Sequence, residues 1–137
     1  MLKIESKPTD EMIADGINSF PDECCGFMFG KEEGDMRTVT TSLIVHNSKE
    51  GDKRRRFEIS PMDYMHAERY ADENNLLLLG IYHSHPNHPS IPSEHDRVAA
   101  QVYFSYVIVS IKEKTFNTIQ SWRLNESSQF EEEQIIP

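Results

Sequence analysis

A group of side chains that commonly bind metal ions occupies the stretch GIYHSHPNHPSIPSEHD, residues 80–96, which follows an apolar run. His83 and His85 are two positions apart in a predicted strand, so both imidazoles point to one face and can share a metal ion. Asp96 is expected in the first turn of the next helix, where the helix dipole favours a carboxylate and the intervening loop returns the chain beside the strand end. These three ligands leave a fourth position open for water, which is typical of catalytic zinc sites.

Glu23 is the candidate base for such a site. It lies between Pro21 and the apolar segment CCGFMFG, which is predicted to be a buried strand. Zinc lowers the pKa of a bound water to about 7, and a nearby carboxylate can take the proton. The alternative explanation is that Glu23 is a solvated surface acid.

The elements that would position these residues alternate between helices and strands. We expect helices over 9–20, over 61–74 with Ser60 as its cap, and from residue 94 with Ser93 as its cap. The expected strands cover residues 24–30, 37–47, 54–59, 76–85, 103–111 and 115–124. The acidic tail that follows is either a last strand or coil. This order predicts one α/β domain over 1–137, with a mixed β-sheet sandwiched by helices.

The spacing of the polar residues resembles the signature of the JAMM, or MPN-plus, zinc metalloproteases. That signature is His-Ser-His, seven residues, Ser, two residues, Asp, and here it is matched by His83-Ser84-His85, Ser93 and Asp96. PDECCGFMFG is similar to the upstream segment of the family and aligns Glu23 with the catalytic glutamate. RRRFEISPMDYMHAERYADENN and SYVIVSI resemble the small stand-alone bacterial branch, which includes enzymes that act on ubiquitin-like sulfur-carrier proteins.

The resemblance implies a cytidine-deaminase-like fold and zinc-dependent hydrolysis of an amide bond at the C-terminal tail of a ubiquitin-like protein. His83, His85 and Asp96 would bind Zn²⁺. Glu23 would take a proton from the zinc-bound water and pass it to the leaving amine, and Ser93 would donate a hydrogen bond to the oxyanion. The chain lacks the long insertions with which relatives hold ubiquitin, which favours a smaller partner, such as a sulfur carrier, or a peptide substrate.

Several of these polar residues also have ordinary structural explanations. Ser93 suits a helix cap, and Asp96 suits a first-turn acid. Ser84 is expected to point away from the two neighbouring histidines and to hydrogen-bond the scaffold. The other histidines are expected in ordinary loop, strand-end or helix positions: His46, His66, His88 and His95.

Two positions depart from the family pattern. The family usually has one cysteine in its upstream segment, whereas this chain has the pair Cys24 and Cys25. Neighbouring cysteines rarely form an unstrained disulfide, so both are predicted to be reduced and buried on a strand, where one of them could face the site. The loop after the histidines has Asn87 where the family often has aspartate.

The overall charge restricts the partners. The formal net charge of −9 argues against non-specific nucleic-acid binding, which requires a basic surface. The one basic run, Lys53–Arg56, is interpreted as a solvated segment, with a docking patch for an acidic partner as the alternative. No apolar stretch approaches the ~20 residues that span a bilayer, and the N-terminus lacks a signal-peptide pattern. We therefore expect a cytoplasmic protein without a membrane partner.

Two other functional classes compete with the metallopeptidase hypothesis. A non-catalytic module could bind a ubiquitin-like tail, although an open metal position would serve no purpose there. A zinc hydrolase of small amino-acid conjugates is the second alternative. The deaminase signature H-x-E…P-C-x-x-C is absent, which argues against a deaminase.

Overall fold

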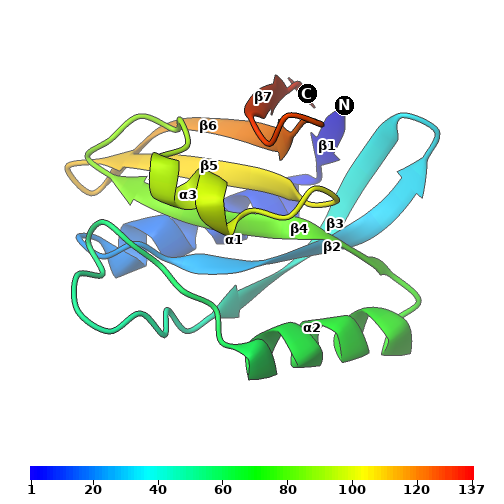
Figure 1. Ribbon diagram of the computed structural model, residues 1–137, viewed down its shortest axis with the longest axis horizontal. Coiled ribbons are helices and arrows are strands. Elements are labelled where there is room, and N and C mark those ends of the chain that lie inside the picture. The colour runs from blue at the N-terminus through cyan, green and yellow to red at the C-terminus, as the bar shows by residue number, and fades with distance from the viewer.

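The computed structural model describes residues 1–137 and is built around one curved sheet of eight strands, in the order β7-β6-β5-β4-β2-β3-β1-β8 (Figure 1). The strands are β1 (Leu2–Ile4), β2 (Cys25–Glu33), β3 (Met36–Val45), β4 (Leu77–Pro86), β5 (Ser105–Lys112), β6 (Thr115–Leu124), β7 (Phe130–Glu133) and β8 (Ile135–Ile136). The helices are α1 (Ser6–Ser19), α2 (Pro61–Glu73) and α3 (Glu94–Ala99). Strand β4 pairs parallel to β5 and antiparallel to β2, so the sheet is mixed. None of the helices is long and apolar enough to cross a membrane.

Helices cover both faces of the sheet, as the sequence predicted, because the strands alternate apolar side chains between two cores. Met12 of α1 packs on one face, in a core that includes Met28, Val39 and Val107. Ala67 and Ala71 of α2 pack on the other face, in a core with Phe27, Phe29 and Ile81. Figure 1 shows α2 below the sheet and α1 on its far side, with α3 in front.

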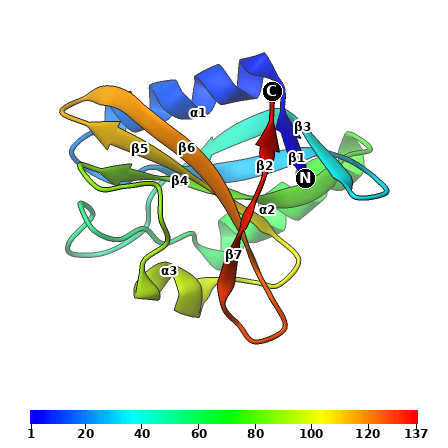
Figure 2. The same cartoon turned by 90° about the horizontal axis from the view of Figure 1, so that it is seen from above.

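The C-terminal segment joins the two edges of the sheet. β7 pairs with β6 at one edge and β8 pairs with β1 at the other, with Gln134 alone between them. The amide of Leu2 donates to the Gln134 carbonyl at 2.9 Å. Figure 2 shows the C-terminus beside β1, which is the neighbour of β8 at the end of the strand order opposite β7. The C-terminal segment therefore supplies the outermost strand at each end of the strand order.

The second helix begins as its sequence indicates. Ser60 accepts a hydrogen bond from the Asp63 amide at 3.2 Å, and its own hydroxyl donates to the Asp63 carboxylate at 2.9 Å. Pro61 occupies the first helical position, where its missing N–H costs nothing. The helix therefore starts at the predicted residue.

Three expectations about the elements were wrong or incomplete. The predicted strand over 54–59 does not form, because the Arg56 carbonyl and the Glu58 amide bond to the side chain of Asn47 and not to a neighbouring strand. The first helix begins at Ser6, three residues earlier than predicted. β1 was missed, because three residues carry no readable alternation and the strand exists only by pairing with β3 and β8.

Candidate functional site

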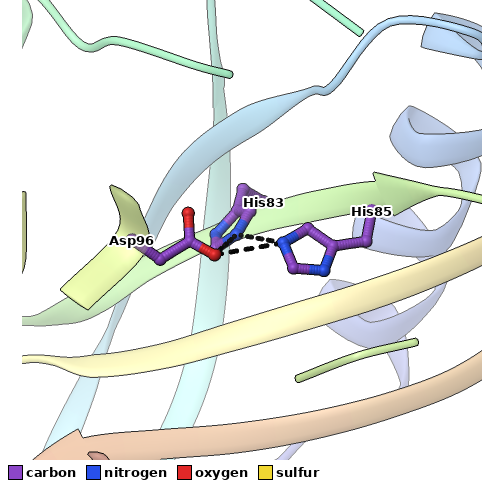
Figure 3. Close-up of side chains that lie close together, drawn as sticks. All are labelled: His83, His85 and Asp96. Atoms are coloured by element: carbon purple, nitrogen blue, oxygen red, sulfur yellow. Dashed lines mark hydrogen bonds and ion pairs between the residues drawn. The ribbon is translucent and has the colours of Figure 1, made fainter. Parts of the chain in front are cut away.

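The end of β4 and the start of α3 bring three potential metal ligands together. His83 and His85 lie on one face of β4, and Asp96 is the third residue of α3. The Nε2 atoms of the two histidines are 3.2 Å apart. Asp96 Oδ2 lies 3.3 Å from Nε2 of His83 and 3.1 Å from Nε2 of His85. Figure 3 shows both imidazoles turned toward the Asp96 carboxylate. The convergence expected from the spacing is therefore present.

Each of these side chains is held by its surroundings. His85 Nδ1 lies 2.8 Å from the Pro89 carbonyl and donates to it, which directs Nε2 toward the cluster. Asp96 Oδ2 accepts from the Ser93 amide at 2.9 Å. The ring of Phe57 stacks on His83 with centroids 4.5 Å apart. The three groups are thus oriented before any ligand binds.

The cluster requires a positive charge among its three inward atoms. Burial lowers the pKa of His83. Burial also acts to lower the pKa of His85, but the hydrogen bonds with Asp96 and the Pro89 carbonyl and the nearby carboxylates together raise it. Burial opposes ionisation of Asp96, yet the two imidazoles and the Ser93 amide hold its pKa well below the usual range. A proton on Nε2 of His85 can form a hydrogen bond with His83 or with Asp96 but not with both, because hydrogen bonds are directional. A divalent cation can bind all three atoms, and two imidazoles with a carboxylate suit zinc. These residues therefore fit a metal ion.

Glu23 lies beside the cluster because of the register between β2 and β4. Cys25 pairs with His83, and the Ser84 amide donates to the Cys24 carbonyl at 3.1 Å, so Glu23 falls opposite His85 on the same face. Glu23 is 6% exposed, and its Oε1 has no hydrogen-bond partner. The solvated-acid alternative is wrong for this chain.

The backbone N–H and C=O groups of Glu23 are both hydrogen-bonded. Its amide donates to the Lys53 carbonyl at 2.7 Å, and its carbonyl accepts from Asn47 Nδ2 at 3.1 Å. Burial raises the pKa of Glu23 to about 8, and the neighbouring His85 opposes this rise. A buried, unpartnered carboxylate next to a metal-ligand cluster is suited to proton transfer.

Ser93 fills the cap position that its sequence context suggests. Its Oγ accepts from the Asp96 amide at 3.1 Å, and the Ser93 amide donates to the Asp96 carboxylate, which completes a capping box. The Ser93 hydroxyl donates no hydrogen bond within the protein, so capping leaves its proton available. A role toward an oxyanion remains a prediction.

Four residues close in the sequence to the metal ligands or to Glu23 have structural roles. Ser84 points to the opposite face and accepts from the Cys24 amide at 2.8 Å. Cys24 and Cys25 are both free thiols and buried. Asn87 takes a left-handed conformation with φ of 58°, which asparagine tolerates, and its side chain accepts from the Glu113 amide at 2.8 Å.

The sequence did not single out two residues of the site. Asn47 forms four hydrogen bonds, to the carbonyls of Glu23 and Arg56 and from the amides of Lys49 and Glu58. Phe57 was assigned to a strand, but it stacks on His83 from an irregular loop. The only signal for Asn47 was its position directly after a β-branched strand, which many loop residues share.

Two hollows border the cluster. The first, here called the apolar cavity, has a volume of about 210 Å³, reaches His83 and Asp96, and also contains His95. Its apolar lining includes Phe57, Tyr64, Ile81, Tyr106, Ile108 and Phe130. The second, here called the Glu23 hollow, has a volume of about 540 Å³ and includes exposed His88. Its other polar lining residues are Glu23, Arg55, Arg56, His85 and Ser93.

Comparisons with known proteins identify the family of this chain. The family of prokaryotic homologues of the JAB domain matches residues 6–125. A desampylase from Pyrococcus furiosus is 28% identical over 120 residues, which cover 88% of this chain and 79% of that protein. Tail tip assembly protein K of Escherichia phage N15 is 28% identical over 85% of this chain, which spans 44% of the phage protein.

Two solved structures resemble the whole chain. A protein from Desulfitobacterium hafniense superposes with a TM-score of 0.87 and is 28% identical, with 99% of this chain and 92% of that chain covered. A protein from Salinibacter ruber superposes with a TM-score of 0.75 and is 32% identical, with coverage of 98% and 90%. By its sequence and its fold, this chain belongs to the prokaryotic JAB-domain family.

Proposed function

We propose that this chain is a zinc-dependent metallopeptidase that hydrolyses an amide bond at the C-terminal tail of a ubiquitin-like protein. The convergence of His83, His85 and Asp96 beside the buried carboxylate of Glu23 carries this proposal. The similarity to a desampylase supports a hydrolase acting on a ubiquitin-like tail. A bacterial sulfur carrier is the partner that the sequence favours.

His83, His85 and Asp96 would hold the metal through two Nε2 atoms and one carboxylate oxygen. A zinc ion with three protein ligands supplies a Lewis acid that acidifies water and polarises a carbonyl. The Pro89 carbonyl keeps His85 in the tautomer that presents Nε2, and the Ser93 amide orients the Asp96 carboxylate. The protein therefore prepares its ligands without help from the substrate.

Glu23 takes the proton of the attacking water and then delivers it to the leaving amine. Its Oε1 is buried and has no competing hydrogen-bond partner, which keeps it available for this transfer. The Glu23 backbone is hydrogen-bonded to the Lys53 carbonyl and to the Asn47 side chain, and these bonds restrict where the carboxylate can lie. Loss of a general base of this kind typically costs ~10²–10⁴ in rate.

Ser93 stabilises the negative oxygen that develops on the scissile carbonyl. Its Oγ accepts one bond as a helix cap, and its hydroxyl proton is then free to donate. Ser93 and Glu23 line the same hollow, so both can reach one substrate group. Removing one oxyanion donor costs about 10²–10³ in kcat in a well-studied hydrolase.

The test combines metal analysis with mass spectrometry. A bacterial sulfur-carrier protein with one extra C-terminal residue is incubated with the zinc-loaded protein, with Glu23→Gln, and with Glu73→Gln, an exposed acid at the end of α2. Cleavage by the parent and by Glu73→Gln, but not by Glu23→Gln, is the expected result. Bound carrier without cleavage would instead support a binding module. Cleavage of small amino-acid conjugates alone would support the second alternative.

A further inference from the structure

We propose that the Glu23 hollow recognises a carboxylate on the leaving group of the substrate and that Arg55 and Arg56 bind it. The inference rests on the proposed hydrolase function, and it assigns the chemical class of the released amine. It also gives a role to the side chains of Arg55 and Arg56, which the proposed mechanism does not use.

The basic run stands out against the charge of the chain. The chain has 14 basic and 23 acidic residues, yet four of the basic residues lie consecutively at Lys53–Arg56. Arg55 and Arg56 line the Glu23 hollow together with His85 and Ser93. The concentration of cations at the site, in a protein of net charge −9, favours an anionic ligand there.

The two arginines are available for such a ligand. Arg55 is largely exposed and has one ionic partner, Asp52, at 3.8 Å. Arg56 is half-buried and takes part in none of the ion pairs of the chain; its Nη1 donates to the Arg55 carbonyl. A guanidinium has five donors, so most of those on Arg56 remain free for a carboxylate.

The loop that carries these arginines is fixed relative to Glu23. Asn47 Nδ2 donates to the carbonyls of both Glu23 and Arg56, each at 3.1 Å. The Glu23 amide donates to the Lys53 carbonyl at 2.7 Å. The basic run is therefore held close to the catalytic acid, which suits recognition of a group only a few bonds from the scissile amide.

The direction of proton transfer decides which part of the substrate lies in each hollow. Glu23 must reach the leaving amine to protonate it, so this amine lies on the side of the Glu23 hollow. The apolar cavity, which borders His83 and Asp96, contains no lysine or arginine. The acyl part of the substrate then lies toward the apolar cavity, and the released amine lies among the cations.

A carboxylate close to a released amine has two common sources. One is the α-carboxylate of a C-terminal residue, which makes the enzyme release a single amino acid. The other is an acidic side chain on the first residue of a longer leaving peptide. Both would bind Arg55 and Arg56 by the same charge-assisted hydrogen bonds, so substrates must distinguish them.

The test compares three sulfur-carrier substrates that end in one added residue: alanine with a free carboxylate, alaninamide, and glutamic acid α-amide. We expect kcat/KM to be about tenfold higher for the free acid than for alaninamide. A rate for the glutamyl amide equal to that of the free acid would assign the carboxylate to a side chain as well. Equal rates for the free acid and alaninamide would overturn the proposal and leave the hydrolase function intact.

Variants assign the preference to particular side chains. Arg55→Gln/Arg56→Gln should abolish the preference for the free acid, because it removes both cations from the hollow, and neither side chain is buried, so both positions tolerate glutamine. Arg54→Gln removes the same type of charge from the same run but does not line the hollow, so it should keep the preference. A preference that persists in the double variant would overturn the assignment to these arginines.

Binding of a carboxylate can be measured even if no carrier is cleaved. Absence of cleavage would count against the proposed function alone. Alanine and alaninamide are titrated separately onto the metal-free protein, and the Nε–H signals of Arg55 and Arg56 are followed by NMR. Saturable shifts with alanine and none with alaninamide would support the carboxylate site. The absence of shifts with alanine would overturn it.

Discussion

Replacing Glu23 with glutamine should change how the stability of the metal-free protein depends on pH. The carboxyl is buried, and its pKa is raised from 4.5 to about 8, chiefly by that burial. The native state therefore binds more protons than the unfolded chain between these values, and the free energy of unfolding falls as the pH rises through this window. Glutamine keeps the shape and removes the titration.

The magnitude follows from the same two values. Each tenfold change in proton affinity corresponds to ~1.4 kcal/mol, so the loss between pH 4.5 and about 8 amounts to roughly 5 kcal/mol. At pH 7 about 3 kcal/mol of it has already occurred. This is a large fraction of the ~5–15 kcal/mol that stabilises an ordinary domain.

Urea unfolding of metal-free protein at several pH values between 4.5 and 8.5 measures the effect. The difference between the parent and Glu23→Gln reports chiefly on the Glu23 carboxyl, because both proteins keep His83 and His85 and burial of the carboxyl is the largest cause of its raised pKa. The parent should lose roughly 5 kcal/mol more than the variant, and Glu73→Gln should follow the parent. Parallel stability curves for the parent and Glu23→Gln would refute the burial argument.

Three further predictions concern the ligands, the loop and the core. Asp96→Asn should reduce bound zinc after dialysis from one equivalent to near zero by elemental analysis, whereas the exposed control Glu94→Gln should retain it. Asn47→Ala removes four hydrogen bonds and should cost about 2–4 kcal/mol in urea unfolding while lowering kcat, because Glu23 loses its support. Tyr82→Phe deletes a 2.8 Å bond to buried Asp15 and should cost ~1–3 kcal/mol with zinc binding unchanged.

Each of these predictions has a contrary outcome. Full zinc retention by Asp96→Asn would exclude its carboxylate as a necessary ligand. Wild-type kcat in Asn47→Ala would show that the loop bonds do not position the base. Loss of zinc in Tyr82→Phe would mean that the core on the α1 side and the metal centre are coupled through β4.

Local patterns in the chain were sufficient to predict most of the site. The two-residue spacing of His83 and His85 settles that they share a face, because strand side chains alternate at every residue. Ser93 and Asp96 form a capping box whose geometry needs only local sequence, so the position of the carboxylate at the helix start was predictable. The alternation of helices and strands likewise predicted the mixed sheet between helices.

Features that depend on long-range pairing were not predictable in this way. β1 and β8 are three and two residues long, and they depend on pairing with distant segments: β1 with β3 and β8, and β8 with β1. Residues 54–59 resembled a strand, but Asn47 offers their backbone groups an alternative partner. A short segment has no intrinsic preference strong enough to resist such a partner.

The chain alone determined which side chains could bind a metal and on which faces of their elements they lie, because helix and strand periodicities are local. Only the tertiary structure decided that Glu23 is buried opposite His85, since that depends on the register between β2 and β4. It also decided that Arg55 and Arg56 border the same hollow as Glu23. Burial, proton affinity and the shape of a hollow arise from packing between segments far apart in the chain, and no local pattern encodes them.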